Sequence, residues 1–104
     1  MALDLDNKIV YFSIDGVFQS SGNPSAGSGG YDFSSSLTPF EDNYFIAIGS
    51  FTNSSNINQC SINFGSPSFA ISSGNTDGNG YGNFEYAVPS GYYSINTKNL
   101  AEYG

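Results

Sequence analysis

One segment of the sequence, GNTDGNGYGNFEY, has the spacing of a cation-binding loop. Asn75, Asp77 and Asn79 alternate and a glycine follows, as oxygen ligands and the turn glycine do in a twelve-residue calcium loop. The bidentate glutamate of that loop belongs at the position of Tyr86, and Asp77 is the one acid in the first half. Such a loop would bind calcium weakly. We therefore predict a tight Asn/Asp/Gly turn and no metal site, with Asn75, Asp77 and Asn79 as weak metal candidates only.

Two further acids, Asp4 and Asp6, alternate with leucines near the start of the chain. On a strand their Cα atoms would lie roughly 6.5 Å apart on one face, which could suit the paired carboxylates of a retaining glycosidase, about 5–5.5 Å apart. The chain has no tryptophan to stack on a sugar, and Lys8 could neutralise one of the acids. With no histidine, the usual base for a serine or cysteine nucleophile is missing. We predict a solvated strand face, no enzyme and no cofactor.

The charge balance limits the class of partner. Nine acids stand against two lysines, which gives a formal net charge of −7. Binding to a polyanion needs Lys and Arg to neutralise phosphates, so neither nucleic acid nor an anionic membrane surface is expected as a partner. The one cysteine, Cys60, excludes an intramolecular disulfide; it is in phase with Ile62 and Phe64 and is predicted to lie in the core.

Length and composition predict a single all-β domain over residues 1–104. Aromatic residues make up 16% of the chain and charged residues 11%, while Gly, Ser and Asn are abundant and typical of long loops. The strands expected from apolar patterning cover residues 2–6, 9–14, 17–19, 44–51, 57–65 and 83–88, the first three as a meander, and residues 90–100 close the domain.

Several of these segments carry more specific expectations. Val10, Phe12 and Ile14 fall on one face of their strand, and Asp15-Gly16 is a two-residue hairpin signal. The continuous apolar run YFIAIGSF is typical of a strand buried on both faces. The connections are a long surface loop at residues 20–39, ordered by aromatic anchors except at its glycine-rich tip, and a Gly/Asn-rich loop at residues 72–83.

The order of these pieces resembles the C-terminal half of a SPRY (B30.2-like) domain, of the type found in bacteriophage and environmental viral structural proteins. The resemblance is carried by ALDLDNKIVYFSIDGVFQSSGNP, YFIAIGSF, INFG and FEYAVPSGYYSINTKNL. It implies an antiparallel β-sandwich of the concanavalin-like jelly-roll kind, incomplete on its N-terminal side. Exposed sheet edges are a liability, so we expect either that this half rearranges into its own compact sandwich or that another chain, such as a repeated subunit on a virion, completes it.

The function that this resemblance implies is a non-enzymatic structural and interaction module of a tail fibre or capsid surface, in host attachment or particle assembly. Its partners would be copies of itself, other virion proteins, or a host-surface glycan or protein. The expected location is the virion surface or the extracellular space, since the sequence has neither a signal peptide nor an apolar run long enough to cross a bilayer.

The alternatives are a free-standing carbohydrate-binding, lectin-like module, weakly assisted by calcium at best, and an inactive fragment. Tyrosines in or beside loops suit sugar binding but are equally explained by packing; they are Tyr31, Tyr81, Tyr92 and Tyr93. The residues predicted to contact a ligand, from the two long loops, are Tyr31, Asp32, Asp77, Asn79 and Tyr81.

Overall fold

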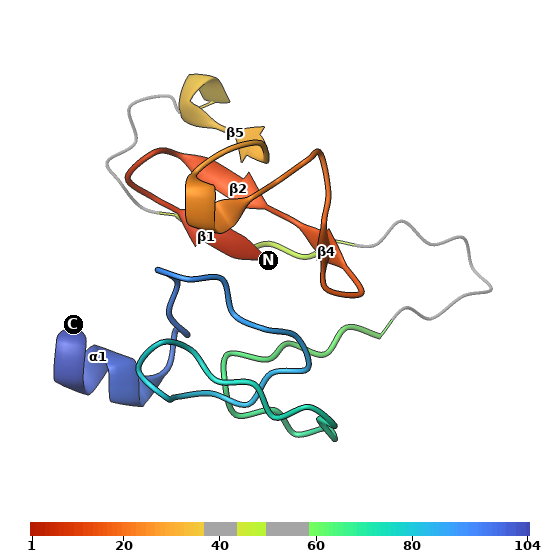
Figure 1. Cartoon of the computed structure of the whole chain (residues 1–104), viewed down its shortest axis with the longest axis vertical. Helices are drawn as coiled ribbons and strands as arrows, with labels where there is room; N and C mark the ends of the chain where they lie inside the picture. Colours follow the sequence, from red (N-terminus) through yellow and green to blue (C-terminus); the bar gives the residue numbers. More distant parts are fainter. Residues whose placement is uncertain (37–43, 50–58) are drawn as a thin grey trace.

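The computed structural model describes residues 1–36, 44–49 and 59–104. It is a small β-rich fold with antiparallel sheets and one short α-helix (Figure 1). In chain order the elements are β1 (Ala2–Asp4), β2 (Ile9–Tyr11), β3 (Ser13–Ile14), β4 (Val17–Phe18), the 3-10 helix η1 (Pro24–Ala26), β5 (Tyr31–Asp32), the 3-10 helix η2 (Ser34–Ser36) and α1 (Thr97–Tyr103). In these described segments, no helix has both the length and the apolar character needed to cross a membrane.

Two antiparallel sheets form from the first third of the chain. The larger has the order β1-β2-β5, with Ala2 opposite Tyr11 and Ile9 opposite Asp32. The smaller is the hairpin β3-β4, whose two-residue turn is Asp15-Gly16. Both turn residues have positive φ, 49° and 80°, as this kind of hairpin turn requires. The two antiparallel pairings of the predicted meander are therefore confirmed, but they lie in two separate sheets and their strands are shorter than predicted.

The apolar core of the described residues is small and is centred on Tyr11. Tyr11 is fully buried, Ala2 is 6% exposed and Pro24 of η1 is also buried; the other apolar side chains of the described segments are partly or fully exposed. The ring of Tyr11 meets Phe18 and Tyr92 edge-on, each with a centroid distance of 6.4 Å. A Cβ at Gly30 would lie 2.7 Å from this ring, so the loop needs glycine there to close over the core.

The apolar alternation of the sequence predicts that the side of Phe12 and Ile14 is buried, but the structure buries the opposite side, which carries Tyr11. Phe12 and Ile14 are 47% and 64% exposed, whereas Tyr11, on the opposite face, is enclosed. The cause is tertiary: Gly30 and Tyr92 come from distant parts of the chain and pack on the Tyr11 side.

Three predicted strands of the second half of the chain are wrong. The described residues 44–49 of the supposed doubly buried strand have no regular secondary structure, and Phe45 is 90% exposed; residues 50–51 lie outside the described residues. Residues 59–65 of the next predicted strand also have no regular strand, and Cys60 is exposed rather than in the core; residues 57–58 lie outside the described residues. Residues 83–88 contribute one isolated bridge, Asn75 to Phe84. An apolar run becomes a buried strand only when other elements cover both of its faces, and the described part of the chain does not supply them.

The C-terminal segment, for which the sequence predicts no helix, ends in α1. Asn96 caps this helix, because its side-chain oxygen accepts a hydrogen bond from the backbone N–H of Asn99 at 2.9 Å. Lys, Leu, Ala and Glu within TKNLAEY are good helix formers. The fold is therefore β-rich with one short helix, and the β-sandwich stays a prediction.

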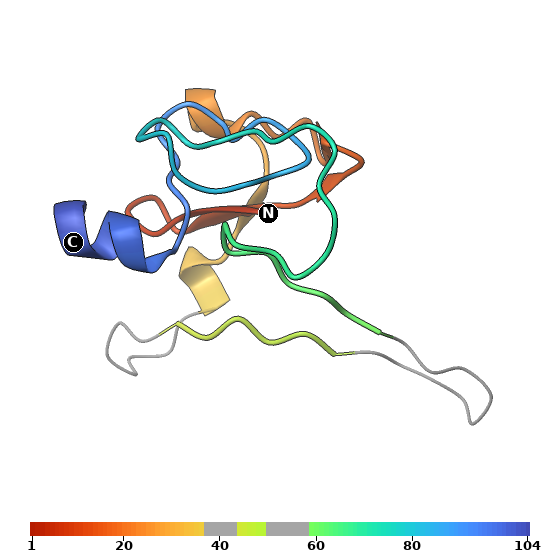
Figure 2. The same cartoon turned by 90° about the horizontal axis from the view of Figure 1, so that it is seen from below.

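The two predicted loops are structured by short elements and turns. Residues 20–36 of the first loop contain η1, β5 and η2, and residues 37–39 lie outside the described residues. The second loop closes on itself, since Asp77 N–H donates to Tyr81 O at 2.8 Å and Gly80 N–H to Asp77 O at 3.0 Å. Figure 2 shows the C-terminal loops on one side of the first sheet and residues 44–49 on the other.

Candidate functional site

Asp77, predicted as a ligand contact, is a buried hydrogen-bond acceptor inside the second half of the chain. It is 6% exposed. Its Oδ1 accepts the backbone N–H groups of Asn79 at 3.0 Å and Tyr81 at 2.9 Å. Its Oδ2 accepts the N–H of Ser94 at 2.9 Å, the hydroxyl of Ser94 at 2.6 Å and the amide of Asn99 at 2.7 Å. One carboxylate thus joins the loop, the segment before α1 and α1 itself.

These hydrogen bonds determine the charge state of Asp77. Burial by itself would raise the pKa of its carboxyl, but the hydrogen bonds from Ser94, Tyr81 and Asn99 together hold the pKa well below its usual range. Asp77 is therefore an ionised carboxylate surrounded by donors. A cation approaching it would meet donor hydrogens instead of free lone pairs.

The other two weak metal candidates also have structural partners. The amide nitrogen of Asn75 donates to the carbonyl oxygens of Phe84 and Glu85, at 3.3 and 2.9 Å. The amide nitrogen of Asn79 donates to Asn99 Oδ1 at 2.8 Å. Within the described ranges, no group of three or more acidic, cysteine or histidine side chains is placed to hold a metal ion. The tight turn predicted for this loop agrees with these contacts.

Tyr81 attaches the same loop to the C-terminal helix. Its hydroxyl donates to Glu102 Oε2 at 2.7 Å, and the ammonium of Lys98 lies 5.2 Å from the centre of its ring. The hydrogen bond to Glu102, with burial and the negative charge of Glu102, raises the pKa of Tyr81 to about 12. Tyr81 thus makes internal contacts here.

Tyr31 and Asp32 lie elsewhere, on β5 at the edge of the first sheet (Figure 1). Tyr31 is 48% exposed, its hydroxyl accepts from Ser20 at 3.0 Å, and its ring lies 5.7 Å from that of Phe12. Asp32 accepts the N–H of Ser34 at 2.8 Å, a contact that lowers its pKa. The five predicted contact residues are therefore divided between β5 and the loop that packs on α1.

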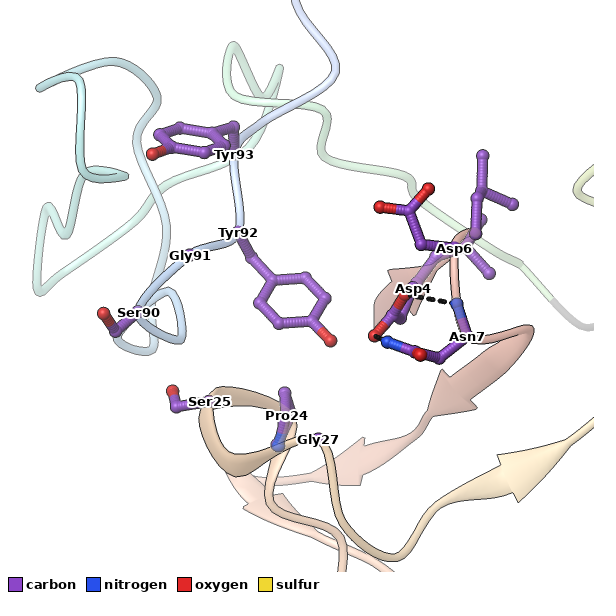
Figure 3. A pocket seen from close by; sticks show the side chains of 12 residues that line it. Asp4, Asp6, Asn7, Pro24, Ser25, Gly27, Ser90, Gly91, Tyr92 and Tyr93 are labelled. Carbon is purple, nitrogen blue, oxygen red and sulfur yellow. Dashed lines mark hydrogen bonds between the residues drawn. The ribbon is translucent and has the colours of Figure 1, made fainter.

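A pocket of about 600 Å³ lies between the β1–β2 turn, η1 and the loop before Ser94 (Figure 3). Its lining consists of acids, an amide, hydroxyls, glycines and two tyrosine rings: Leu3, Asp4, Leu5, Asp6, Asn7, Pro24, Ser25, Gly27, Ser90, Gly91, Tyr92 and Tyr93. Three segments that are far apart in the sequence therefore meet around one open cavity.

The polar end of the pocket is organised by Asp4 and Asn7. Asp4 Oδ1 accepts the backbone N–H of Asn7 at 2.9 Å, and Asp4 Oδ2 accepts its side-chain amide at 2.8 Å. Both contacts lower the pKa of Asp4 and hold the turn after β1 closed. The carboxylate therefore keeps its place and its charge without any ligand.

The ring of Tyr92 points into the pocket with its hydroxyl toward Asp4 and Asn7, whereas the ring of Tyr93 turns away (Figure 3). Burial, and next the neighbouring Tyr11 and Asp4, raise the pKa of Tyr92. The ring of Tyr11 supports Tyr92 edge-on. The buried hydroxyl of Tyr11 makes no hydrogen bond within the described part of the chain.

Some of these pocket residues carry a signal in the sequence. The spacing of Asp4 and Asp6 suggests paired carboxylates, and Tyr92 and Tyr93 are loop aromatics that suit a sugar. Nothing in the sequence places the two pairs together, because more than 80 residues separate them. Asn7, Ser25 and Ser90 carry no signal beyond their turn-forming composition.

Comparison with known proteins gives no relative for this chain. No family model, curated protein or solved structure matches it. The resemblance to a SPRY domain therefore stays a prediction, and function is argued from the residues.

Proposed function

We propose that the chain is a non-enzymatic structural and interaction module that works as one of several copies on the surface of a viral particle, in host attachment or particle assembly. The viral setting comes from the SPRY resemblance. The observation that carries the assembly part is the large amount of apolar surface that the chain exposes.

The size of this surface supports an assembly. Seventeen large apolar side chains of the described segments are at least 40% exposed, among them Phe45 at 90% and Val17 at 67%. Large exposed apolar patches mark sites of contact with other proteins. With only three buried apolar side chains in the described segments, Ala2, Tyr11 and Pro24, the chain gains little core by folding alone.

We assign the contact between copies to an exposed surface that we call the hairpin patch: Phe12, Ile14, Val17 and Tyr31. Phe12 and Tyr31 are in ring contact, and Ile14 and Val17 are cross-strand partners. All four are 47–67% exposed. The patch adjoins β5, an edge strand of the described sheet, so a second copy could both cover the patch and extend the sheet. Such a copy would supply the second layer of the predicted β-sandwich.

The test is the solution mass of the purified chain, measured by light scattering coupled to size exclusion. We expect a defined multiple of 11.0 kDa. Val17→Asp should dissociate the assembly, because Val17 is 67% exposed and a charge at a buried interface is unfavourable. The matched control is Leu100→Asp on α1, where Leu100 is 62% exposed and lies outside the patch; it should leave the mass unchanged.

A folded 11.0 kDa monomer would contradict the assembly proposal and favour the second candidate, a free-standing carbohydrate-binding module. That candidate is supported by one observation, the polar and aromatic pocket beside Tyr92. An assembly that persists in Val17→Asp but dissociates in Leu100→Asp would contradict the assignment of the interface to the hairpin patch.

A further inference from the structure

We propose that the pocket between the β1–β2 turn, η1 and Tyr92 binds a neutral, hydroxyl-rich sugar unit. This inference deepens the host-attachment part of the proposed function and rests on it only for the biological role. It places the ligand away from β5 and from the Asp77 loop. Its residues are Asp4, Asp6, Asn7 and Tyr92, with two glycines in the wall.

The size and the wall of the pocket suit a sugar ring. A volume of about 600 Å³ lies within the range of small-ligand sites. Gly27 and Gly91 line it with positive φ, 63° and 86°, and a Cβ at either position would meet no atom within 4 Å. The backbone itself forms these parts of the wall, so a ligand can approach it closely.

The polar groups supply mainly hydrogen-bond acceptors. Each carboxylate oxygen of Asp4 accepts one hydrogen bond from Asn7, which leaves a second lone pair on each oxygen. Asp6 adds a second carboxylate, and the amide oxygen of Asn7 a further acceptor. Sugar hydroxyls are donors that can match them, and hydrogen bonds to an ionised acceptor are the stronger kind.

Tyr92 supplies the apolar surface that a sugar also requires. Its ring extends into the pocket beside the polar groups of the β1–β2 turn (Figure 3). Tyr11 holds this ring in an edge-on contact at 88°, so little side-chain entropy remains to be lost on binding. A sugar ring has C–H groups on its faces and hydroxyls at its rim, and this pocket offers an aromatic ring and acceptors side by side.

The negative charge of the pocket lining disfavours the binding of anionic sugars. The lining contains two carboxylates and neither lysine nor arginine, and the chain has a net charge of −7. Sialic acid, uronic acids and sulfated sugars would be repelled. A small cation would be attracted by both carboxylates, so a diamine is included in the test to separate cation binding from sugar binding.

The experiment is a titration of the full-length chain followed by amide chemical shifts in NMR. The probes are the methyl glycosides of glucose, galactose, mannose and N-acetylglucosamine, with N-acetylneuraminic acid and 1,4-diaminobutane as charged comparisons. We expect saturable shifts at residues 4–7, 25–27 and 90–93 with at least one neutral glycoside, at roughly millimolar affinity. N-acetylneuraminic acid should leave these residues unshifted.

Two variants and a matched control test the assignment. Asp6→Asn removes the charge but keeps the shape, and should weaken binding about five- to tenfold, the difference between a charged and a neutral acceptor. Asp15→Asn makes the same change in the hairpin turn, outside the pocket, and should leave the affinity unchanged. Tyr92→Ala should abolish binding, with circular dichroism to verify the fold.

Three outcomes would overturn the proposal: no shift with any neutral glycoside, shifts confined to residues outside the pocket, or saturable binding of the diamine alone. The solution mass, measured on the same samples, separates this inference from the assembly proposal. A monomer that binds a neutral sugar would support the sugar site and contradict the assembly. An assembly that binds no neutral sugar would support the assembly and contradict the sugar site.

Discussion

Asp77 shows that the type of a residue and its near neighbours in the sequence do not determine whether its side chain is exposed or buried. Its neighbours Asn79 and Gly80 predict a tight turn, and two of the hydrogen bonds that Asp77 accepts are local to that turn. The partners that bury it, Ser94 and Asn99, are 17 and 22 residues away. An exposed loop acid and a buried acceptor look identical in the sequence, because only the distant partners distinguish them.

We expect Asp77→Ala to lower the free energy of unfolding by about 2–4 kcal/mol at pH 7, because five donated hydrogen bonds lose their acceptor in a buried place. Urea unfolding measures this loss. Asp6→Ala, on the surface, should change stability by less than about 0.5 kcal/mol. An equally small effect at Asp77 would contradict its structural role.

The stability difference between the wild type and Asp77→Ala should also depend on pH. The folded-state pKa of Asp77 is depressed below the ordinary value of 3.8. Its contribution is therefore complete above that value and is lost as pH falls through it toward the folded-state pKa. The stability difference between wild type and Asp77→Ala should shrink below about pH 4. A difference that stays constant down to pH 2 would contradict the depressed pKa.

At the scale of elements, α1 shows how a cap and tertiary contacts form a helix that its length would not support alone. Seven residues are too few for an isolated helix in water. Asn96 caps the first turn, Asn99 bonds to Asp77, and Glu102 accepts from Tyr81. The loop of residues 77–81 therefore anchors a helix that the sequence does not predict.

Asn96→Ala should cost about 1 kcal/mol of stability, since the cap loses its acceptor for the N–H of Asn99. Asn96→Ser should recover most of that loss, because serine is a comparable N-cap residue. Thermal unfolding followed by circular dichroism measures both variants. Equal losses in Ala and Ser would mean that another contact of Asn96, such as the one to Ser94, dominates.

At the scale of the whole molecule, many more apolar side chains of the described residues are exposed than are buried in the core. Phe45, Ile62 and Leu100 are each more than half exposed, and the described core is centred on one ring. Such a chain is expected to draw part of its stability from neighbouring copies. Its folding and its assembly would then be one equilibrium.

This coupling predicts a melting temperature that depends on protein concentration. Mass action for a dimer should raise Tm by about 5–10 °C over a hundredfold increase in concentration. Differential scanning fluorimetry over that range provides the measurement. Val17→Asp should show a flat and lower Tm, and a flat Tm in the wild type would contradict the coupling.

Short-range features of this protein follow from the sequence itself. The β1–β2 and β3–β4 pairings, the Asp15-Gly16 turn and the turn at Asp77 each depend on backbone preferences and on contacts within a few residues. Such preferences act in any context, so these predictions are confirmed. The charge balance is a property of composition alone, and the absence of a polyanion partner stays a prediction.

Tertiary contacts determined which faces are buried and where side chains meet. Tyr11 is enclosed rather than Phe12 because Gly30 and Tyr92 pack on its side of the sheet. Cys60 and Phe45 are exposed because the described chain places no second layer over them. The pocket exists only because residues 90–93 return to the β1–β2 turn. Burial and ligand sites depend on contacts between residues that are distant in the sequence. The local pattern of apolar and polar residues does not predict such contacts.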